Sequence, residues 1–295
     1  MSATVKPLTW KSKKLWNNIK ETLEGQKFLV VFDLETTGLS PEKDRIIELA
    51  ALLFRYDEKT LCMSMLDDLH MFINPEIPID KAITDLTGIS NESVADKPTE
   101  SEAFETISEF FNETIVSGYN VESFDVNFLK NMYARQGCEY KTKGIIDILR
   151  MARDRIDKTE IENHKLVTVG DYFGIKFRAH SALGDTATTA SLLQLFLFEY
   201  MNAESDESSA EPLNGTERPD VQSVTFWEGY QGYSRIYVNT SAGSLFYDIR
   251  GHCWEPKDAE LNIIDMEWLE SECWRIAEVK SEPEFIKFKG TIKVA

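Results

Sequence analysis

Two carboxylates stand two positions apart where an apolar run near the start of the chain ends. The run that begins at Phe28 closes on Asp33, and Glu35 follows it. Because side chains alternate along a strand, both carboxylates leave one face of it. They repel each other unless a cation neutralises them, and oxygen ligands of this kind suit Mg²⁺ or Mn²⁺. The pair therefore predicts a divalent metal site, although a solvated turn explains a D-x-E pair that stands alone.

Two further acidic residues stand where the pattern changes to helix. Asp125 follows the sequence GYNVESF, and Asp185 follows HSALG, which begins with His180. Free backbone N–H groups and the helix dipole favour an acid at a helix N-terminus, so each can be an ordinary cap. His180 falls in a loop, and it is the side chain of the three that titrates near neutrality without help.

In chain order these pieces resemble the DEDDh 3′–5′ exonucleases, the DnaQ-like group of the ribonuclease H-like fold. The matching motifs are D-x-E at the first strand, F-D at a strand-to-helix junction and H-x4-D at the last helix. The surrounding sequences DRIIELAALLF and IPIDKAITDLTGISNESVADKP match too. The second is most similar to the exonuclease domain of Gram-positive replicative polymerases, and the group includes the proofreading subunit of bacterial DNA polymerase III.

The resemblance implies a site of four metal ligands and one general base: Asp33, Glu35, Asp125 and Asp185 would bind two divalent cations, and His180 would accept a proton. Substrate contacts are expected from Thr36, Thr37, Gly38, Leu39 and Asn120. Two positions depart from the commonest pattern, because Tyr119 and Thr87 stand where many relatives have His. All five catalytic positions are intact, so the departures concern only the detail of substrate contact.

The implied activity is a metal-dependent 3′–5′ exonuclease. It would release nucleoside 5′-monophosphates from single-stranded or frayed DNA ends, in proofreading or repair. Two metals can hold the attacking and leaving oxygens of an in-line displacement, while the histidine takes a proton from the attacking water. Two alternatives stay open: a 3′–5′ exonuclease of RNA or oligoribonucleotides, and a binding subunit that recruits a polymerase or repair complex.

The elements that must position these residues follow from the hydrophobic pattern. Expected strands are 28–33, 45–56, 69–74, 114–119 and 144–148, and expected helices are 99–112, 126–136, 166–173 and 185–201. Three neighbouring strands followed by alternation with helices predict an α/β fold with a ribonuclease H-like mixed sheet covered by helices.

Four segments are expected along the chain. Residues 1–26 form a basic leader with an amphipathic helix over about 9–24, which either packs on the main domain or docks a partner or nucleic acid. Residues 27–201 form the exonuclease domain, and 202–220 an acidic flexible linker. Residues 221–295 form a small α+β domain, with strands at 221–229, 234–239, 244–249 and 285–289 and a helix at 265–278.

The C-terminal segment is rich in aromatic residues, and its role stays open. Its aromatic side chains either fill a small β-rich core or stack nucleic-acid bases; they include Trp227, Tyr230, Tyr233, Tyr237 and Phe246. The sequence QLFLF at 194–198 resembles a motif that docks on the bacterial sliding clamp, but it falls in a helix whose apolar residues should face a core.

Composition limits the remaining possibilities. The 295 residues carry 50 acidic and 32 basic side chains, a net charge of −18, which disfavours broad duplex binding. No apolar run approaches the roughly 20 residues that span a bilayer, so no membrane association is expected. The four cysteines are scattered, which favours a reduced, cytoplasmic protein.

Overall fold

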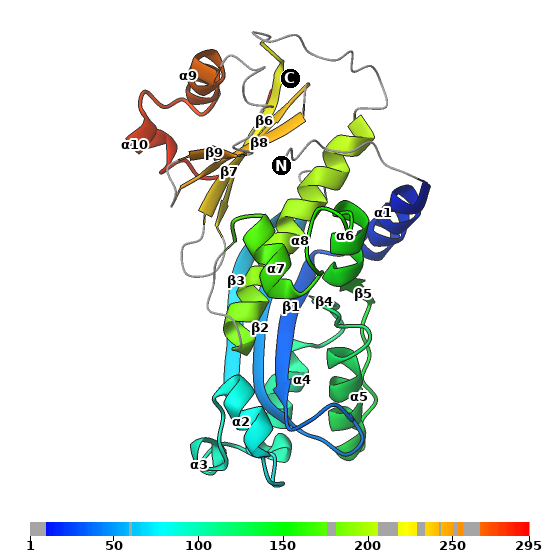
Figure 1. Cartoon of the computed structure of the whole chain (residues 1–295). Helices are drawn as coiled ribbons and strands as arrows, with labels where there is room; N and C mark the ends of the chain where they lie inside the picture. The colour runs from blue at the N-terminus through cyan, green and yellow to red at the C-terminus, as the bar shows by residue number, and fades with distance from the viewer. Residues whose placement is uncertain are drawn as a thin grey trace. The chain divides into compact units, whose positions relative to one another are not determined.

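The computed structural model describes residues 10–58, 61–175, 181–205, 218–228, 234–241, 243–249, 253–255 and 266–294 (Figure 1). The chain divides into two compact units. The motif-bearing unit comprises residues 14–58 and 65–193, and the C-terminal unit comprises 1–13, 59–64 and 194–295.

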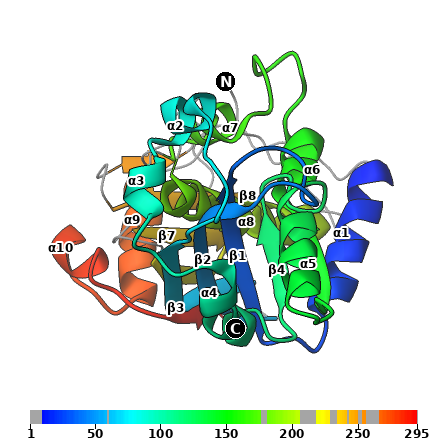
Figure 2. The ribbon, with the colours of Figure 1, turned by 90° about the horizontal axis from the view of Figure 1, so that it is seen from below.

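The motif-bearing unit is built on a five-stranded sheet in the order β3-β2-β1-β4-β5. Its strands are β1 (Phe28–Thr36), β2 (Ile46–Asp57), β3 (Cys62–Phe72), β4 (Ile115–Gly118) and β5 (Gly144–Asp147). β1 pairs antiparallel with β2 and parallel with β4, and β5 continues the parallel part. Figure 2 shows β3, β2, β1 and β4 side by side in this order. The predicted ribonuclease H-like mixed sheet is confirmed.

The helices cover both faces of this sheet. They are α1 (Trp10–Leu23), α2 (Lys81–Thr87), α3 (Asn91–Val94), α4 (Glu100–Phe110), α5 (Asp125–Arg135), α6 (Ile148–Arg155), α7 (Leu166–Tyr172) and α8 (Ala182–Ser205). α4 and α5 pack on the face that contains Phe32 and Leu34. α8 lies against the opposite face, where the Thr186 hydroxyl donates to the carbonyl of Ala50 at 3.2 Å. Strand alternation therefore turns Asp33 and Glu35 toward the α8 face.

Several boundaries differ from those expected. β3 begins at Cys62 rather than Leu69, because pairing with β2 carries the strand through the polar residues Asp67 and Asp68. α8 begins at Ala182 and continues to Ser205, inside the segment expected to be linker. Strand length here is set by the neighbouring strand, which a local hydrophobic pattern does not reveal.

The leader helix and the end of α8 are both packed by apolar residues. In α1, Trp16, Ile19 and Leu23 are buried, so the apolar face of this helix is packed. In α8, all residues from Gln194 to Phe198 are buried, so the clamp-like sequence is a core segment and is not displayed for docking.

The C-terminal unit contains a second five-stranded sheet, in the order β10-β6-β7-β8-β9. The strands are β6 (Val221–Glu228), β7 (Ser234–Thr240), β8 (Gly243–Asp248), β9 (Cys253–Glu255) and β10 (Thr291–Lys293), with helices α9 (Met266–Ile276) and α10 (Glu282–Phe285). The strand expected at 285–289 is wrong, because Phe285 ends α10 and buries its ring in the core.

The aromatic residues of this unit serve its core. Trp227 and Tyr237 are each only 1% exposed, and the Tyr237 ring stacks on Phe198 with centroids 4.3 Å apart. Tyr230 and Tyr233 lie outside the described residues. Base stacking by Trp227 or Tyr237 is therefore excluded in this fold, since neither ring has a free face.

None of the helices in the described part of the chain combines the length and the hydropathy that crossing a bilayer requires.

Candidate active site

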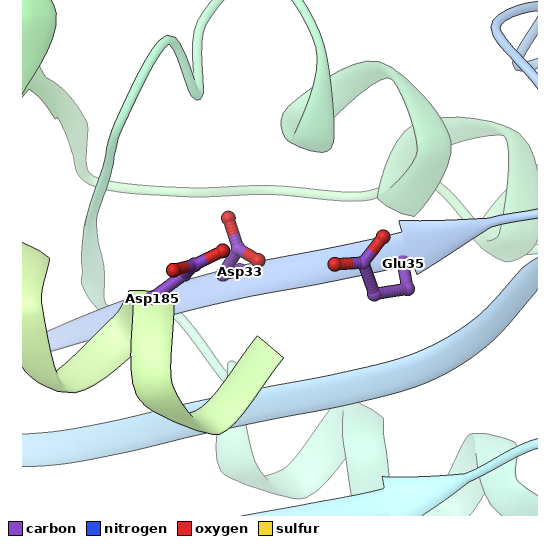
Figure 3. A group of neighbouring side chains, drawn as sticks. All are labelled: Asp33, Glu35 and Asp185. Carbon is purple, nitrogen blue, oxygen red and sulfur yellow. The ribbon is translucent and has the colours of Figure 1, made fainter. Parts of the chain in front are cut away.

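Three carboxylates from distant parts of the sequence meet on the α8 face of the sheet. Asp33 and Glu35 come from β1, and Asp185 comes from the first turn of α8 (Figure 3). One ligand atom from each lies within 4.8 Å of the others, and all three side chains are half-buried. Asp33 and Glu35 lie near each other because they are two residues apart in one strand. Asp185 reaches them only because the first turn of α8 packs against the sheet.

Asp125 joins this group from the edge of β1. It is the first residue of α5 and not the N-cap, which is Phe124. Instead its Oδ1 accepts a hydrogen bond from the backbone N–H of Leu34 at 3.2 Å. Asp125 is 3% exposed, and its carboxylate bonds to the backbone of the residue that separates Asp33 from Glu35 in β1. The capping role considered from the sequence is replaced by a tertiary one.

Burial and neighbouring negative charges raise the pKa values of Asp33, Glu35 and Asp125. Burial is the largest cause for Asp33, and the charges of Asp125, Asp185 and Glu35 add to it, so its pKa lies well above the usual range. Burial, followed by the charge of Asp185, raises the pKa of Glu35 to about 7. Burial raises the pKa of Asp125 to about 8, against the lowering effect of its backbone hydrogen bonds.

The donor set fits a divalent cation. Every named influence on the pKa of Asp33 and Glu35 raises it, which means that uncompensated negative charge is concentrated at one point. Carboxylate oxygens are the ligands that Mg²⁺ and Mn²⁺ prefer, and a cation relieves the repulsion that folding creates. Asp33, Glu35 and Asp185 supply a shared site, and Asp125 stands beside Asp33 to extend it.

The residues that follow β1 form a braced loop. The Thr36 hydroxyl donates to the carbonyl of Gly38 at 2.6 Å, and the Thr37 hydroxyl donates to Asp44 at 3.3 Å. A Cβ at Gly38 would lie 2.5 Å from the Asp44 carboxylate, so a larger residue there would displace Asp44 from its hydrogen bonds to Thr37 and Ser40. Leu39 is 83% exposed at the tip, available to touch a substrate.

Asn120 is placed by a residue that sequence reasoning missed. Its φ of 64° is left-handed, and its backbone N–H donates to Asp147 at 3.2 Å. Asp147 also accepts from the N–H groups of Glu122 and Leu149, so one buried carboxylate fixes the loop between β4 and α5. The sequence contained a signal for this residue, because Asp147 ends a short apolar run as Asp33 does.

Two other expected residues have different outcomes. Tyr119, which departs from the family pattern, is anchored: its hydroxyl donates to the carbonyl of His164 at 2.7 Å, and burial raises its pKa. His180 lies outside the described residues, next to Ser181, so its place relative to the carboxylates stays a prediction.

Comparison with known proteins gives one family and a consistent set of relatives. A family model described as exonuclease (RNase_T) matches residues 30–193, more than half of the chain. The DNA polymerase III PolC-type of Pediococcus pentosaceus is 35% identical over 59% of this chain. The PolC-type enzyme of Bacillus cereus is 32% identical over 79% of this chain. The matched parts span only 12% and 16% of those two relatives.

Solved structures give the same fold. A zinc-bound complex of E. coli ExoI with single-stranded DNA has a TM-score of 0.51 at 18% identity, covering 76% of this chain and 55% of that one. A complex of E. coli Exonuclease I with a dT13 oligonucleotide has a TM-score of 0.51 at 16% identity, covering 92% and 63%. At this identity the likeness concerns the fold.

Proposed function

The chain belongs to the DnaQ-like exonuclease family, and from this premise we propose that it removes nucleotides from the 3′ end of single-stranded or frayed DNA. The convergence of Asp33, Glu35 and Asp185, with Asp125 beside them, is the observation that carries the proposal. DNA is placed ahead of RNA because the relatives at 32–35% identity are named as DNA polymerases. Proofreading or repair is the corresponding cellular role.

Each residue has a defined task in this reaction. Asp33, Glu35, Asp125 and Asp185 would hold two divalent cations, Mg²⁺ or Mn²⁺. When bound, the cations would stabilise the attacking and the leaving oxygen at phosphorus. His180 would accept the proton of the attacking water on an imidazole nitrogen, so that the products are a 3′ hydroxyl and a nucleoside 5′-monophosphate.

The residues around the carboxylates would hold the terminal nucleotide. Leu39 is exposed on the braced loop, with Thr36, Thr37 and Gly38 forming its base, and Asn120 is exposed at the other side of β1. Leu39 and Asn120 are exposed, and the backbone around them is fixed by hydrogen bonds to Asp44 and Asp147. This combination supports a preformed contact surface rather than one that folds around the substrate.

The test uses a 5′-labelled single-stranded DNA and an RNA of the same sequence, with Mg²⁺, followed in time on a denaturing gel. Shortening of the DNA from its 3′ end supports the proposal, and preferential loss of the RNA moves the enzyme to RNA turnover. Asp33→Asn should abolish cleavage, whereas Asp68→Asn removes the same charge from the exposed part of β3 and should leave the rate unchanged.

Absence of cleavage with both Mg²⁺ and Mn²⁺ would contradict the proposal and favour a binding subunit for a polymerase or repair complex.

A further inference from the structure

A fifth carboxylate, Glu48, lies beside the acidic site but points elsewhere. It stands opposite Glu35 in the register of β1 and β2 and is only 2% exposed. One of its oxygens, Oε2, accepts the backbone N–H of Ala182 at 3.3 Å. The other, Oε1, lies 2.7 Å from Nε2 of His70 on β3. Nε2 of His70 can donate a hydrogen bond to this oxygen.

These two bonds join three elements of the motif-bearing unit. Ala182 is the first residue of α8, and the N–H groups of the first turn have no partner within a helix. Asp185 follows in the same turn, and only Ser181 separates Ala182 from His180. The N-terminal end of the helix that carries one proposed metal ligand is therefore tied to β2.

A buried carboxylate so near other carboxylates needs hydrogen bonds to be tolerated. His70 of β3, whose side chain is 30% exposed, supplies one of these hydrogen bonds. With both oxygens engaged by the scaffold, Glu48 is directed away from the ligand cluster formed by Asp33, Glu35 and Asp185.

We propose that the His70–Glu48 pair is a positioning device for the N-terminus of α8, which holds Asp185 in place beside Asp33 and Glu35 of β1. The expected effect on cleavage rests on the proposed function, whereas the expected effect on the N-terminus of α8 rests on geometry alone. Glu48 also contributes charge, since it raises the pKa of Asp33 and Glu35. The experiments must separate position from charge.

The structural test needs no activity. Amide hydrogen exchange of the full chain is measured without metal, for the peptide that covers residues 181–187. Glu48→Gln has one acceptor in place of two, and the Ala182 amide should exchange about tenfold faster. His70→Ala should accelerate the same amide, and His70→Gln, which can still donate, should restore protection. Unchanged exchange in Glu48→Gln and His70→Ala would overturn the proposal.

The kinetic test compares kcat and KM on single-stranded DNA at saturating Mn²⁺. A displaced α8 N-terminus should lower kcat of Glu48→Gln about tenfold to a hundredfold, with KM for DNA little changed. His70→Ala should lower kcat as well and His70→Gln should recover most of it, while Asp68→Asn serves as the matched control. If saturating Mn²⁺ fully restores Glu48→Gln, the residue acts by charge alone and the positioning role is wrong.

The two proposals fail separately. An inactive wild-type protein contradicts the exonuclease activity and leaves the exchange result standing, whereas an active wild type with unchanged variants contradicts only the His70–Glu48 pair.

Discussion

At the scale of single residues, this protein concentrates buried negative charge at one site, although such charge destabilises a folded protein. Burial and mutual repulsion raise the pKa of Asp33, Glu35 and Asp125 together. Such a site weakens the metal-free fold and creates the driving force for binding a divalent cation. Function and stability therefore oppose each other at these positions, and substitutions should move them in opposite directions.

Asp185→Asn should stabilise the metal-free protein and abolish cleavage. Loss of one charge relieves Asp33 and Glu35, and relief equivalent to one pKa unit is about 1.4 kcal/mol, or roughly 3 °C in Tm for a domain of this size. Thermal unfolding in a chelator measures the gain, and the increase in Tm on adding Mn²⁺ should shrink. A lower Tm than that of the wild type in chelator would contradict the electrostatic account.

The stability of the metal-free protein should fall as pH rises. Glu35 and Asp125 have folded-state pKa values raised to about 7 and about 8, above those of an unfolded chain. The folded protein thus binds more protons than the unfolded one between about pH 4 and pH 8, and this stabilisation is lost as pH rises through the folded values. In chelator, the Tm should fall between pH 6 and pH 9.

Divalent metal should remove much of this dependence, so its effect on Tm should be larger at pH 8.5 than at pH 6. Glu35→Gln is the control, since it removes one of the titrating groups and should flatten the profile in chelator. A metal effect independent of pH would contradict the assignment.

At the scale of elements, loops around the site are braced by charged groups from the scaffold. Arg135 of α5 makes two hydrogen bonds of 2.7 Å to Glu100 of α4, whose side chain is 8% exposed. Arg135 also donates to the carbonyl of Pro41 at 3.4 Å, in the loop that displays Leu39. The two helices are therefore joined to each other and to the loop that follows β1.

Arg135→Ala should lower the free energy of unfolding by about 2 kcal/mol, because the buried Glu100 carboxylate loses two short charged hydrogen bonds and keeps only the 4.0 Å contact with Arg45. Urea denaturation measures the change. The matched control is Lys81→Ala, which breaks the exposed pair of Lys81 with Asp85 and should cost less than about 1 kcal/mol. Equal losses in both variants would show that burial of the Arg135 pair has no energetic consequence.

At the scale of the whole molecule, the end of α8 belongs to the C-terminal unit. Residues from Gln194 onward group with that unit, and Phe198 stacks on Tyr237 of β7. The division into an exonuclease domain at 27–201, a linker at 202–220 and a domain at 221–295 stays a prediction, as does the cytoplasmic location. α8 itself runs to Ser205, and residues 206–217 lie outside the described part.

Removal of residues 206–295 should expose Phe198 and lower the Tm, with aggregation on heating, because the truncated chain keeps the helix and loses the sheet it packs on. Tyr237→Ala tests the same contact in the full chain and should cost about 3–5 kcal/mol. Phe28→Ala is the control, since that ring is 45% exposed. A truncated chain as stable as the full one would contradict the packing.

The sequence alone determined the order of the motifs, the types of the proposed catalytic residues and the fold class. Asp33 and Glu35 share a face because strand alternation is local, and the apolar runs marked most strands and helices. Only the tertiary structure decided that Asp125 bonds to Leu34 instead of capping α5, and that β3 begins at Cys62. It also decided that Glu48 ties α8 to His70. Each of these contacts depends on which elements pack side by side. Hydrophobic periodicity shows which face of a helix or strand is buried, but it does not show which element packs against that face.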